Sequence, residues 1–194
     1  MPHDIVQAGD PVLRQKTREL TREEILSEEV QSLIGAMFET MWAAPGVGLA
    51  APQIGISLAI AVIEDKQEFI DRMAPGVAKE RRRRAVPPHV LINPRLTIET
   101  PAEEEFFEGC LSLAGFTAVV PRALRVKVEA LNERAEPVSI DADGWYARIL
   151  QHEIDHLNGT LYIDRMHTRT FSTLENFNRL QQAPPATQTG PQKG

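Results

Sequence analysis

The segment Gln151-His152-Glu153-Ile154-Asp155-His156 constrains this chain more than any other stretch. In a helix, His152 and His156 lie on one face, one turn apart. Two imidazoles at that spacing can hold one divalent metal ion. Glu153 borders the same face and can take a proton from water without being a ligand. The pattern predicts a hydrolytic metal site on a helix, although a surface helix with two flanking histidines also fits this motif alone.

Neighbouring residues of the same helix divide into two sets. Ile149 shares the stripe of His152, Glu153 and His156, so we expect it to form an apolar wall beside the metal. The remaining apolar positions point elsewhere and are expected to anchor the helix in the core; they are Leu150, Ile154, Leu157 and Leu161.

Composition indicates a soluble globular chain. Its 194 residues are 42% hydrophobic and 25% charged, with a net charge of -6 that argues against nucleic-acid binding. Apolar runs fall short of the ~18 residues that span a bilayer, and the N-terminus lacks a signal or transit pattern, so we expect a cytoplasmic protein. The single cysteine, Cys110, excludes an internal disulfide. We predict one catalytic domain over residues 1–182 and a disordered tail over 183–194.

Hydrophobic periodicity predicts an α+β fold, with small antiparallel or mixed sheets packed around the central helix. One helix is predicted over 28–43 and a last one over 173–180. The predicted strands cover 58–63, 90–99, 124–131 and 137–140, with a further short strand at 161–163. Residues 65–86 contain Arg81-Arg82-Arg83-Arg84 and are interpreted as an exposed loop; a polyanion site is the less favoured alternative.

Two further segments carry candidate site residues. Residues 46–55 are too rich in glycine and alanine for an ordinary strand, and small residues allow close approach of a ligand or backbone. Within them, Gln53 is a lone polar side chain. A catalytic metal needs three protein ligands. The two histidines supply two of them, and three positions can be weighed for the third. Tyr162 stands where metzincins carry histidine, Glu175 suits a gluzincin, and Cys110 offers a thiolate.

Three motifs together resemble those of peptide deformylases. They are Gly46-Val47-Gly48-Leu49-Ala50-Ala51-Pro52-Gln53, Glu108-Gly109-Cys110-Leu111-Ser112 and the histidine motif, in that order. The similarity extends over residues 5–166. The stretches 114–148 and 168–171 look more like the mitochondrial-type branch, and we expect a bacterial member of it.

The resemblance implies hydrolysis of the N-formyl group of formylmethionyl nascent peptides, with release of formate. The implied metal ligands are Cys110, His152 and His156, and the ion is expected to be Fe(II), with Ni, Co or Zn as possible replacements. Glu153 would be the general base, while the Gln53 amide and the Leu111 N–H would stabilise the oxyanion.

The resemblance also implies how substrate is held. Backbone groups of Val47, Gly48 and Gly109 would pair with an extended peptide. An apolar pocket for methionine is expected near Val47, Phe106, Trp145, Ile149 and His152. Glu108 and Arg122 would form a supporting ion pair.

Several alternatives remain at this stage. A gluzincin-like endopeptidase using Glu175 and a catalytically silent metal-binding module both retain the histidine motif.

Relatives that dock on the ribosome end in a basic helix, whereas residues 172–182 contain Arg179 as their one cation, so only transient ribosome contact is considered.

Overall fold

The computed structural model describes residues 2–100 and 103–182, so the predicted tail at 183–194 lies outside the described residues. The chain starts with η1 (Pro11–Arg14), α1 (Arg22–Ile25) and α2 (Glu28–Ala43). Thr21 and Glu24 form a capping box at α1, and the Ser27 side chain caps α2. The helix predicted over 28–43 is confirmed. Trp42, near the end of this helix, is half-exposed, and its indole Nε1 donates to Glu64.

Two antiparallel sheets follow. The larger has the strand order β1-β2-β3-β6-β7, formed by β1 (Gly48–Ala50), β2 (Ile60–Asp65), β3 (Val86–Ile98), β6 (Arg125–Leu131) and β7 (Pro137–Asp143). The smaller has the order β4-β5-β8, formed by β4 (Glu103–Glu108), β5 (Phe116–Ala123) and β8 (Ser172–Thr173). Both β1 and β4 are therefore edge strands, each with one side that carries no strand among the described residues.

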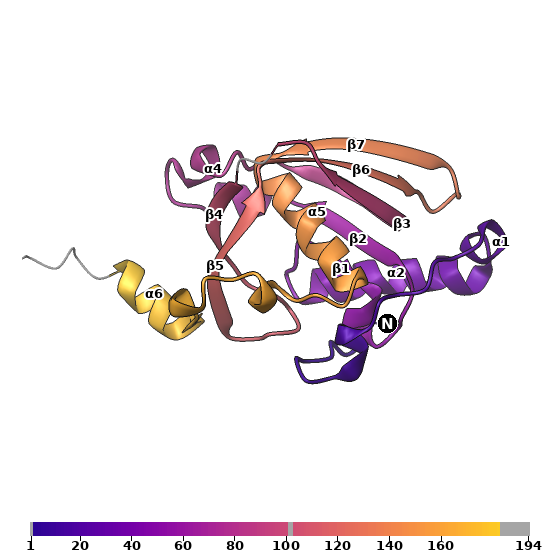
Figure 1. The fold of residues 1–194 in the computed structure, drawn as a ribbon, viewed down its shortest axis with the longest axis horizontal. Helices are drawn as coiled ribbons and strands as arrows, with labels where there is room; N and C mark the ends of the chain where they lie inside the picture. The colour runs from indigo at the N-terminus through magenta and orange to yellow at the C-terminus, as the bar shows by residue number, and fades with distance from the viewer. Residues whose placement is uncertain (1, 101–102, 183–194) are drawn as a thin grey trace, which may run out of the picture.

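Helix α5 (Gly144–Leu157) starts directly after β7 and lies between the two sheets (Figure 1). Leu150 and Ile154 pack in the core of the larger sheet, and the chain after the helix brings Leu161 and Tyr162 into a cluster with β5. The polar face of α5 is also buried, because residues 151–157 are all enclosed. This arrangement confirms the predicted α+β fold around a central helix.

Three local predictions were wrong. Residues 46–55 do form a strand, β1, followed by η2 (Ala51–Ile54). Residues 65–86 are not an open loop: they contain α3 (Gln67–Asp71) and α4 (Val77–Glu80), and Arg83 makes a bidentate ion pair with the buried Asp65. The strand expected at 161–163 is the 3-10 turn η3 (Tyr162–Asp164). These segments are set by tertiary contacts, which override local propensity.

The C-terminal part of the described chain lies beside the smaller sheet (Figure 1). It consists of η4 (Thr168–Thr170), β8 and α6 (Leu174–Gln182), which agrees with the helix predicted over 173–180. Phe177 of α6 packs against Phe107 of β4, with ring centroids 4.5 Å apart. Helix α6 is thereby attached to the edge strand that leads into the Cys110 segment.

Candidate metal centre and active site

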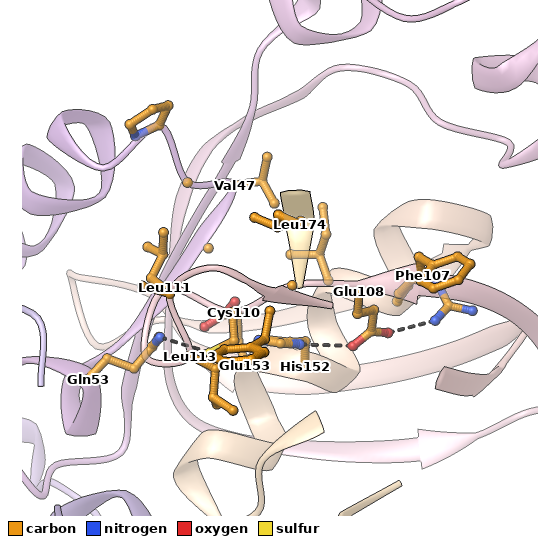
Figure 2. A pocket seen from close by; sticks show the side chains of 18 of the residues that line it. Val47, Gln53, Phe107, Glu108, Cys110, Leu111, Leu113, His152, Glu153 and Leu174 are labelled. Carbon is orange, nitrogen blue, oxygen red and sulfur yellow. Dashed lines mark hydrogen bonds and ion pairs between the residues drawn. The ribbon is translucent and has the colours of Figure 1, made fainter. Parts of the chain in front are cut away.

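Cys110, His152 and His156 come together between the end of β4 and the middle of α5 (Figure 2 shows Cys110 and His152). Their ligand atoms all lie within 4.8 Å of one another, and Cys110 Sγ is 3.3 Å from His156 Nε2. All three side chains are buried. Glu175, the alternative ligand, is exposed on α6 and lies outside this cluster. Of the three candidates for the third ligand, Cys110 is therefore the one that the structure places beside the two histidines.

The three ligands suit a divalent ion. His152 Nδ1 is 3.0 Å from Glu108 Oε2, which leaves Nε2 of the same ring for a metal. Metal-binding histidines are commonly oriented by such a carboxylate. Burial lowers the pKa of His156 well below its ordinary value, which keeps its imidazole neutral, as a ligand must be. One thiolate and two imidazoles match the donors that borderline divalent ions prefer.

Glu153 lies directly beside the ligand cluster without belonging to it. Its side chain is 4% exposed, and Oε2 accepts no hydrogen bond from any described residue. Burial raises its pKa to about 7. Gly48 of β1 faces this carboxylate so closely that a Cβ there would lie 2.2 Å from Oε1. Glu153 is thus enclosed, unpartnered on one oxygen, and positioned by the backbone of β1.

Gln53 points its amide nitrogen at the same centre. Its Oε1 accepts from the Ala50 N–H at 2.9 Å, which fixes the orientation of the amide. Its Nε2 then donates toward Cys110 Sγ at 3.6 Å (Figure 2) and toward Ser112 Oγ at 3.3 Å. Because both acceptors belong to the Cys110 segment, the amide N–H groups lie at the metal end of the site.

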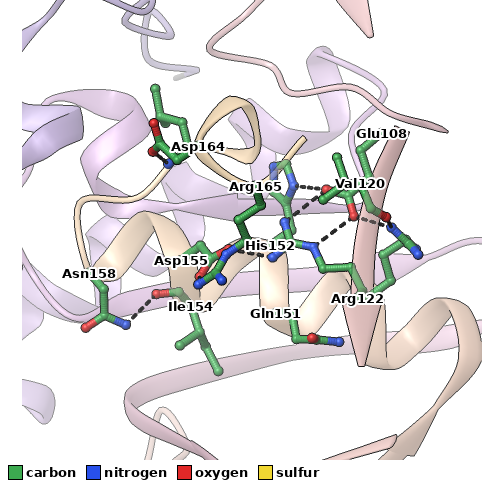
Figure 3. A network of polar contacts seen from close by, with 12 residues as sticks. Glu108, Val120, Arg122, Gln151, His152, Ile154, Asp155, Asn158, Asp164 and Arg165 are labelled. Carbon is green, nitrogen blue, oxygen red and sulfur yellow. Dashed lines mark hydrogen bonds and ion pairs between the residues drawn. The ribbon is translucent and has the colours of Figure 1, made fainter. Parts of the chain in front are cut away.

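Glu108 links His152 to two buried arginines through a network of hydrogen bonds. It accepts two hydrogen bonds from Arg122, both at 3.0 Å, and one from Arg148 at 2.6 Å, besides its contact with His152 (Figure 3). Burial acts to raise the pKa of this carboxyl, but His152 and Arg122 outweigh it and hold the pKa well below its usual range. The predicted ion pair between Glu108 and Arg122 is present, and it is part of a larger network.

The sequence interpretation missed the rest of that network. Arg122 also donates to Asp155 at 2.5 Å, and Asp155 accepts a bidentate pair from Arg165 at 2.7 Å on both atoms (Figure 3). Asp155 belongs to the histidine motif itself, one residue before His156. Acidic and basic residues at these separations give no signal in a single sequence, because strands β4 and β5 and helix α5 are what bring them together.

A cavity of about 450 Å³ opens onto the metal centre. It is lined by Val47, Gly48, Gly109, Trp145 and Ile149, all expected there, together with Gln53, Glu153 and His152. Phe106 does not line it. Successive side chains of a strand point to opposite faces, so β4 turns Phe107 into the cavity, while Phe106 packs against Trp145 from the other side, with ring centroids 6.2 Å apart.

Further lining residues were not expected from the sequence. Leu113, Phe116 and Leu174 add apolar surface from the Cys110 segment, β5 and α6, and Arg81 reaches the cavity from the end of α4. Alternation along β4 separates Phe107 from Phe106, but it does not by itself say which of the two faces the cavity. Separately, among the described residues no helix is both long and apolar enough to cross a membrane.

An α+β fold with a buried HExxH helix, a cysteine beside its two histidines and an adjacent carboxylate is the arrangement of a metal-dependent hydrolase. The family model for polypeptide deformylase matches residues 2–172, and the chain belongs to this family. Proteins of the family use a single divalent metal ion, in agreement with the Cys110, His152 and His156 cluster.

Individual relatives agree with this assignment. The chain is 51% identical over 175 residues to the chloroplastic peptide deformylase 1A of Solanum lycopersicum, covering 90% of this chain but only 63% of that protein. It is 45% identical over 174 residues to peptide deformylase 3 of Streptomyces avermitilis, covering 90% and 75%. The crystal structure of a Synechococcus elongatus peptide deformylase in complex with actinonin has a TM-score of 0.71 at 36% identity, covering 92% and 83%. Since organellar and bacterial proteins both match, the mitochondrial-type branch and the bacterial origin stay predictions.

Proposed function

We propose that this chain hydrolyses the N-formyl group of formylmethionyl nascent peptides and releases formate. The observation that carries the proposal is the convergence of Cys110, His152 and His156 with Glu153 and the Gln53 amide on one cavity. The cavity therefore contains a group for each task of formamide hydrolysis: side chains that can hold a metal ion, a carboxylate that can take a proton from water, and an amide that can donate to the oxyanion. Family membership and the relatives named peptide deformylase support the same activity. The active unit in this proposal is a single catalytic domain, residues 1–182.

Cys110, His152 and His156 would hold one divalent ion, with Fe(II) as the expected native metal and Ni, Co or Zn as replacements. When bound, such an ion polarises the formyl carbonyl and makes water more acidic. The thiolate adds an anionic, soft donor, so the site favours iron or a later transition metal over magnesium or calcium.

Glu153 is proposed as the general base and acid. Its buried carboxylate accepts a proton from the attacking water and then delivers that proton to the leaving amine. As the carbonyl oxygen gains charge, the Gln53 amide and the Leu111 N–H donate to it. The Ala50 N–H fixes the Gln53 amide before substrate arrives, so little reorganisation is needed during reaction.

Substrate is proposed to bind as an added strand beside β1. Gly48 lies on the edge strand of the larger sheet, and Gly109 follows directly after β4, an edge strand of the smaller one. Backbone groups of Val47, Gly48 and Gly109 can therefore pair with an extended peptide. Its methionine side chain would lie between Val47, Trp145 and Ile149. The cavity is also the place where we expect actinonin to bind, as it does to the Synechococcus elongatus protein.

Formate release from a formyl-Met tripeptide by protein loaded anaerobically with Fe(II) or Ni(II) tests this proposal. We expect one formate per free amine formed, and no product from the acetyl-Met analogue under the same conditions. No formate from metal-replete, folded protein would overturn it and leave a silent metal-binding module. Cleavage of internal peptide bonds without formate release would instead favour the endopeptidase alternative.

The expected partners are nascent peptides. Ribosome contact through α6 is at most transient in this proposal, because α6 presents Arg179 together with Glu175 rather than a basic face. A cytoplasmic location follows if the origin is bacterial.

A further inference from the structure

The wall of the cavity contains one cation that the proposed chemistry does not use. Three guanidinium groups surround the Trp145 ring: those of Arg81, Arg83 and Arg148 lie 4.8, 5.4 and 5.7 Å from its centroid. Arg83 is neutralised by Asp65, and Arg148 by Glu108. Arg81 forms no ion pair or side-chain hydrogen bond with any described residue. It is half-buried and lines the cavity.

The position of Arg81 relative to the metal centre follows from α5. Trp145, Ile149 and His152 lie along one stripe of this helix and all line the cavity. Trp145 precedes His152 by seven residues, so it lies about 10 Å away along the helix axis. An unbranched side chain that starts near the metal end can extend past Ile149 toward Trp145. Arg81, stacked on Trp145, therefore lies at the far end of the methionine subsite.

The chemistry at this end differs from a plain apolar pocket. The indole Nε1 of Trp145 is fully buried, which leaves the Arg81 guanidinium as the accessible donor. A guanidinium has five N–H groups and no acceptor. The same segment shows that a guanidinium and a thioether suit each other here, since Arg83 Nη1 lies 3.8 Å from Met73 Sδ. Burial, together with repulsion from Arg83 and Arg148, lowers the pKa of Arg81, and a hydrogen-bond acceptor beside its guanidinium would offset both effects.

We propose that Arg81 is a specificity-determining residue of this subsite, selecting unbranched side chains whose end carries a hydrogen-bond acceptor. This inference rests on the proposed deformylase function. Thioether sulfur is a weak acceptor, while a sulfoxide oxygen is a strong one. The enzyme therefore also accepts peptides that begin with N-formylmethionine sulfoxide. The reaction is the same hydrolysis: water adds to the formyl carbon, the C–N bond breaks, and formate and an amine with its sulfoxide intact are released.

The test compares kcat/KM for three formyl tripeptides that differ only in the first side chain: methionine, methionine sulfoxide and norleucine. In the parent enzyme, we expect the sulfoxide peptide to react at least as well as the norleucine peptide, despite its higher polarity. In Arg81→Leu, the sulfoxide-to-norleucine ratio should fall at least about tenfold, the scale of one hydrogen bond from a charged donor. Arg81→Gln, which keeps a neutral donor, should give an intermediate ratio.

Arg72→Leu is the matched control, because Arg72 belongs to the same segment, residues 65–86, is exposed, and lies outside the cavity. Its three kcat/KM values should equal those of the parent. If Arg81→Leu leaves the sulfoxide-to-norleucine ratio unchanged, or if the parent rejects the sulfoxide peptide while hydrolysing the other two, the role of Arg81 is wrong. If the enzyme releases no formate from any of the three peptides, the proposed deformylase function itself is wrong.

Discussion

A methyl group on Gly48 would lie 2.2 Å from Oε1 of Glu153. The backbone of β1 thus forms the wall against which the proposed general base rests. This contact explains why residue 48 is a glycine although it lies in a strand. It also links the geometry of the proposed base to a residue 105 positions earlier in the chain.

Gly48→Ala is therefore expected to displace the Glu153 carboxylate while leaving the metal ligands in place. Activity should fall by roughly 10²-fold, because misplacing a catalytic group by about 1 Å can cost that much. Formate release and bound metal, measured on the same sample, check this. Gly35→Ala is the matched control, since a Cβ there meets nothing within 4 Å; it should retain activity and gain up to ~1 kcal/mol of stability in α2.

Glu153→Gln is expected to keep the metal and lose most turnover. The amide preserves the shape of the side chain but cannot accept the proton of water, and general base catalysis is typically worth ~10²–10⁴-fold. Metal analysis together with kcat for a formyl-Met tripeptide provides the measurement. Near-parental turnover by the metal-loaded variant would exclude Glu153 from proton transfer.

Gln53→Ala should lower kcat more than it raises KM. The Nε2 group is held at the metal end by the hydrogen bond between Oε1 and the Ala50 N–H, where it can donate to charge that develops in the transition state. Loss of one such donor costs roughly 10²–10³-fold in kcat. Steady-state kinetics separate the two parameters. A variant whose single defect is a higher KM would assign Gln53 to substrate positioning.

Cys110→Ser should weaken metal binding or change which metal supports activity, because a hydroxyl is a harder and poorer ligand than a thiolate at neutral pH. In the parent, the thiol should resist alkylation while metal is bound and react after chelation. Mass spectrometry of iodoacetamide-treated protein measures this. Glu175→Ala serves as the control and should leave the metal content unchanged, since Glu175 is exposed and outside the ligand cluster.

Glu108→Gln should destabilise the fold and weaken metal binding together. The substitution removes the charge that Arg122 and Arg148 share in a buried site, and breaking such a pair costs about 3–5 kcal/mol. It also removes the anionic partner of His152 Nδ1, and such partners are typically worth 10–100-fold in metal affinity. Urea denaturation and metal titration measure the two effects. A variant with unchanged stability and affinity would show that the network is dispensable.

Local patterns predicted a large part of this molecule. The spacing of apolar residues placed α2 at its observed bounds, and alternation predicted β6 and its hairpin with β7. Phe106 shows where such reasoning fails: strand alternation separates Phe106 from Phe107, but only the packing of β4 against α6 and the cavity decides which of the two faces inward.

The sequence by itself indicated the chemistry of the site, because His152 and His156 are one helical turn apart and Glu153 borders the same helix face. The placement of Cys110 beside the two histidines, the contacts between Asp155 and Arg165, and the approach of Arg81 to the cavity were decided only by tertiary structure. These groups come from segments far apart in the chain, and no local propensity encodes their meeting. They meet because the two sheets are packed against α5, which buries apolar surface between them, and because the Trp145 N–H at the start of α5 donates to the Arg81 carbonyl at the end of α4.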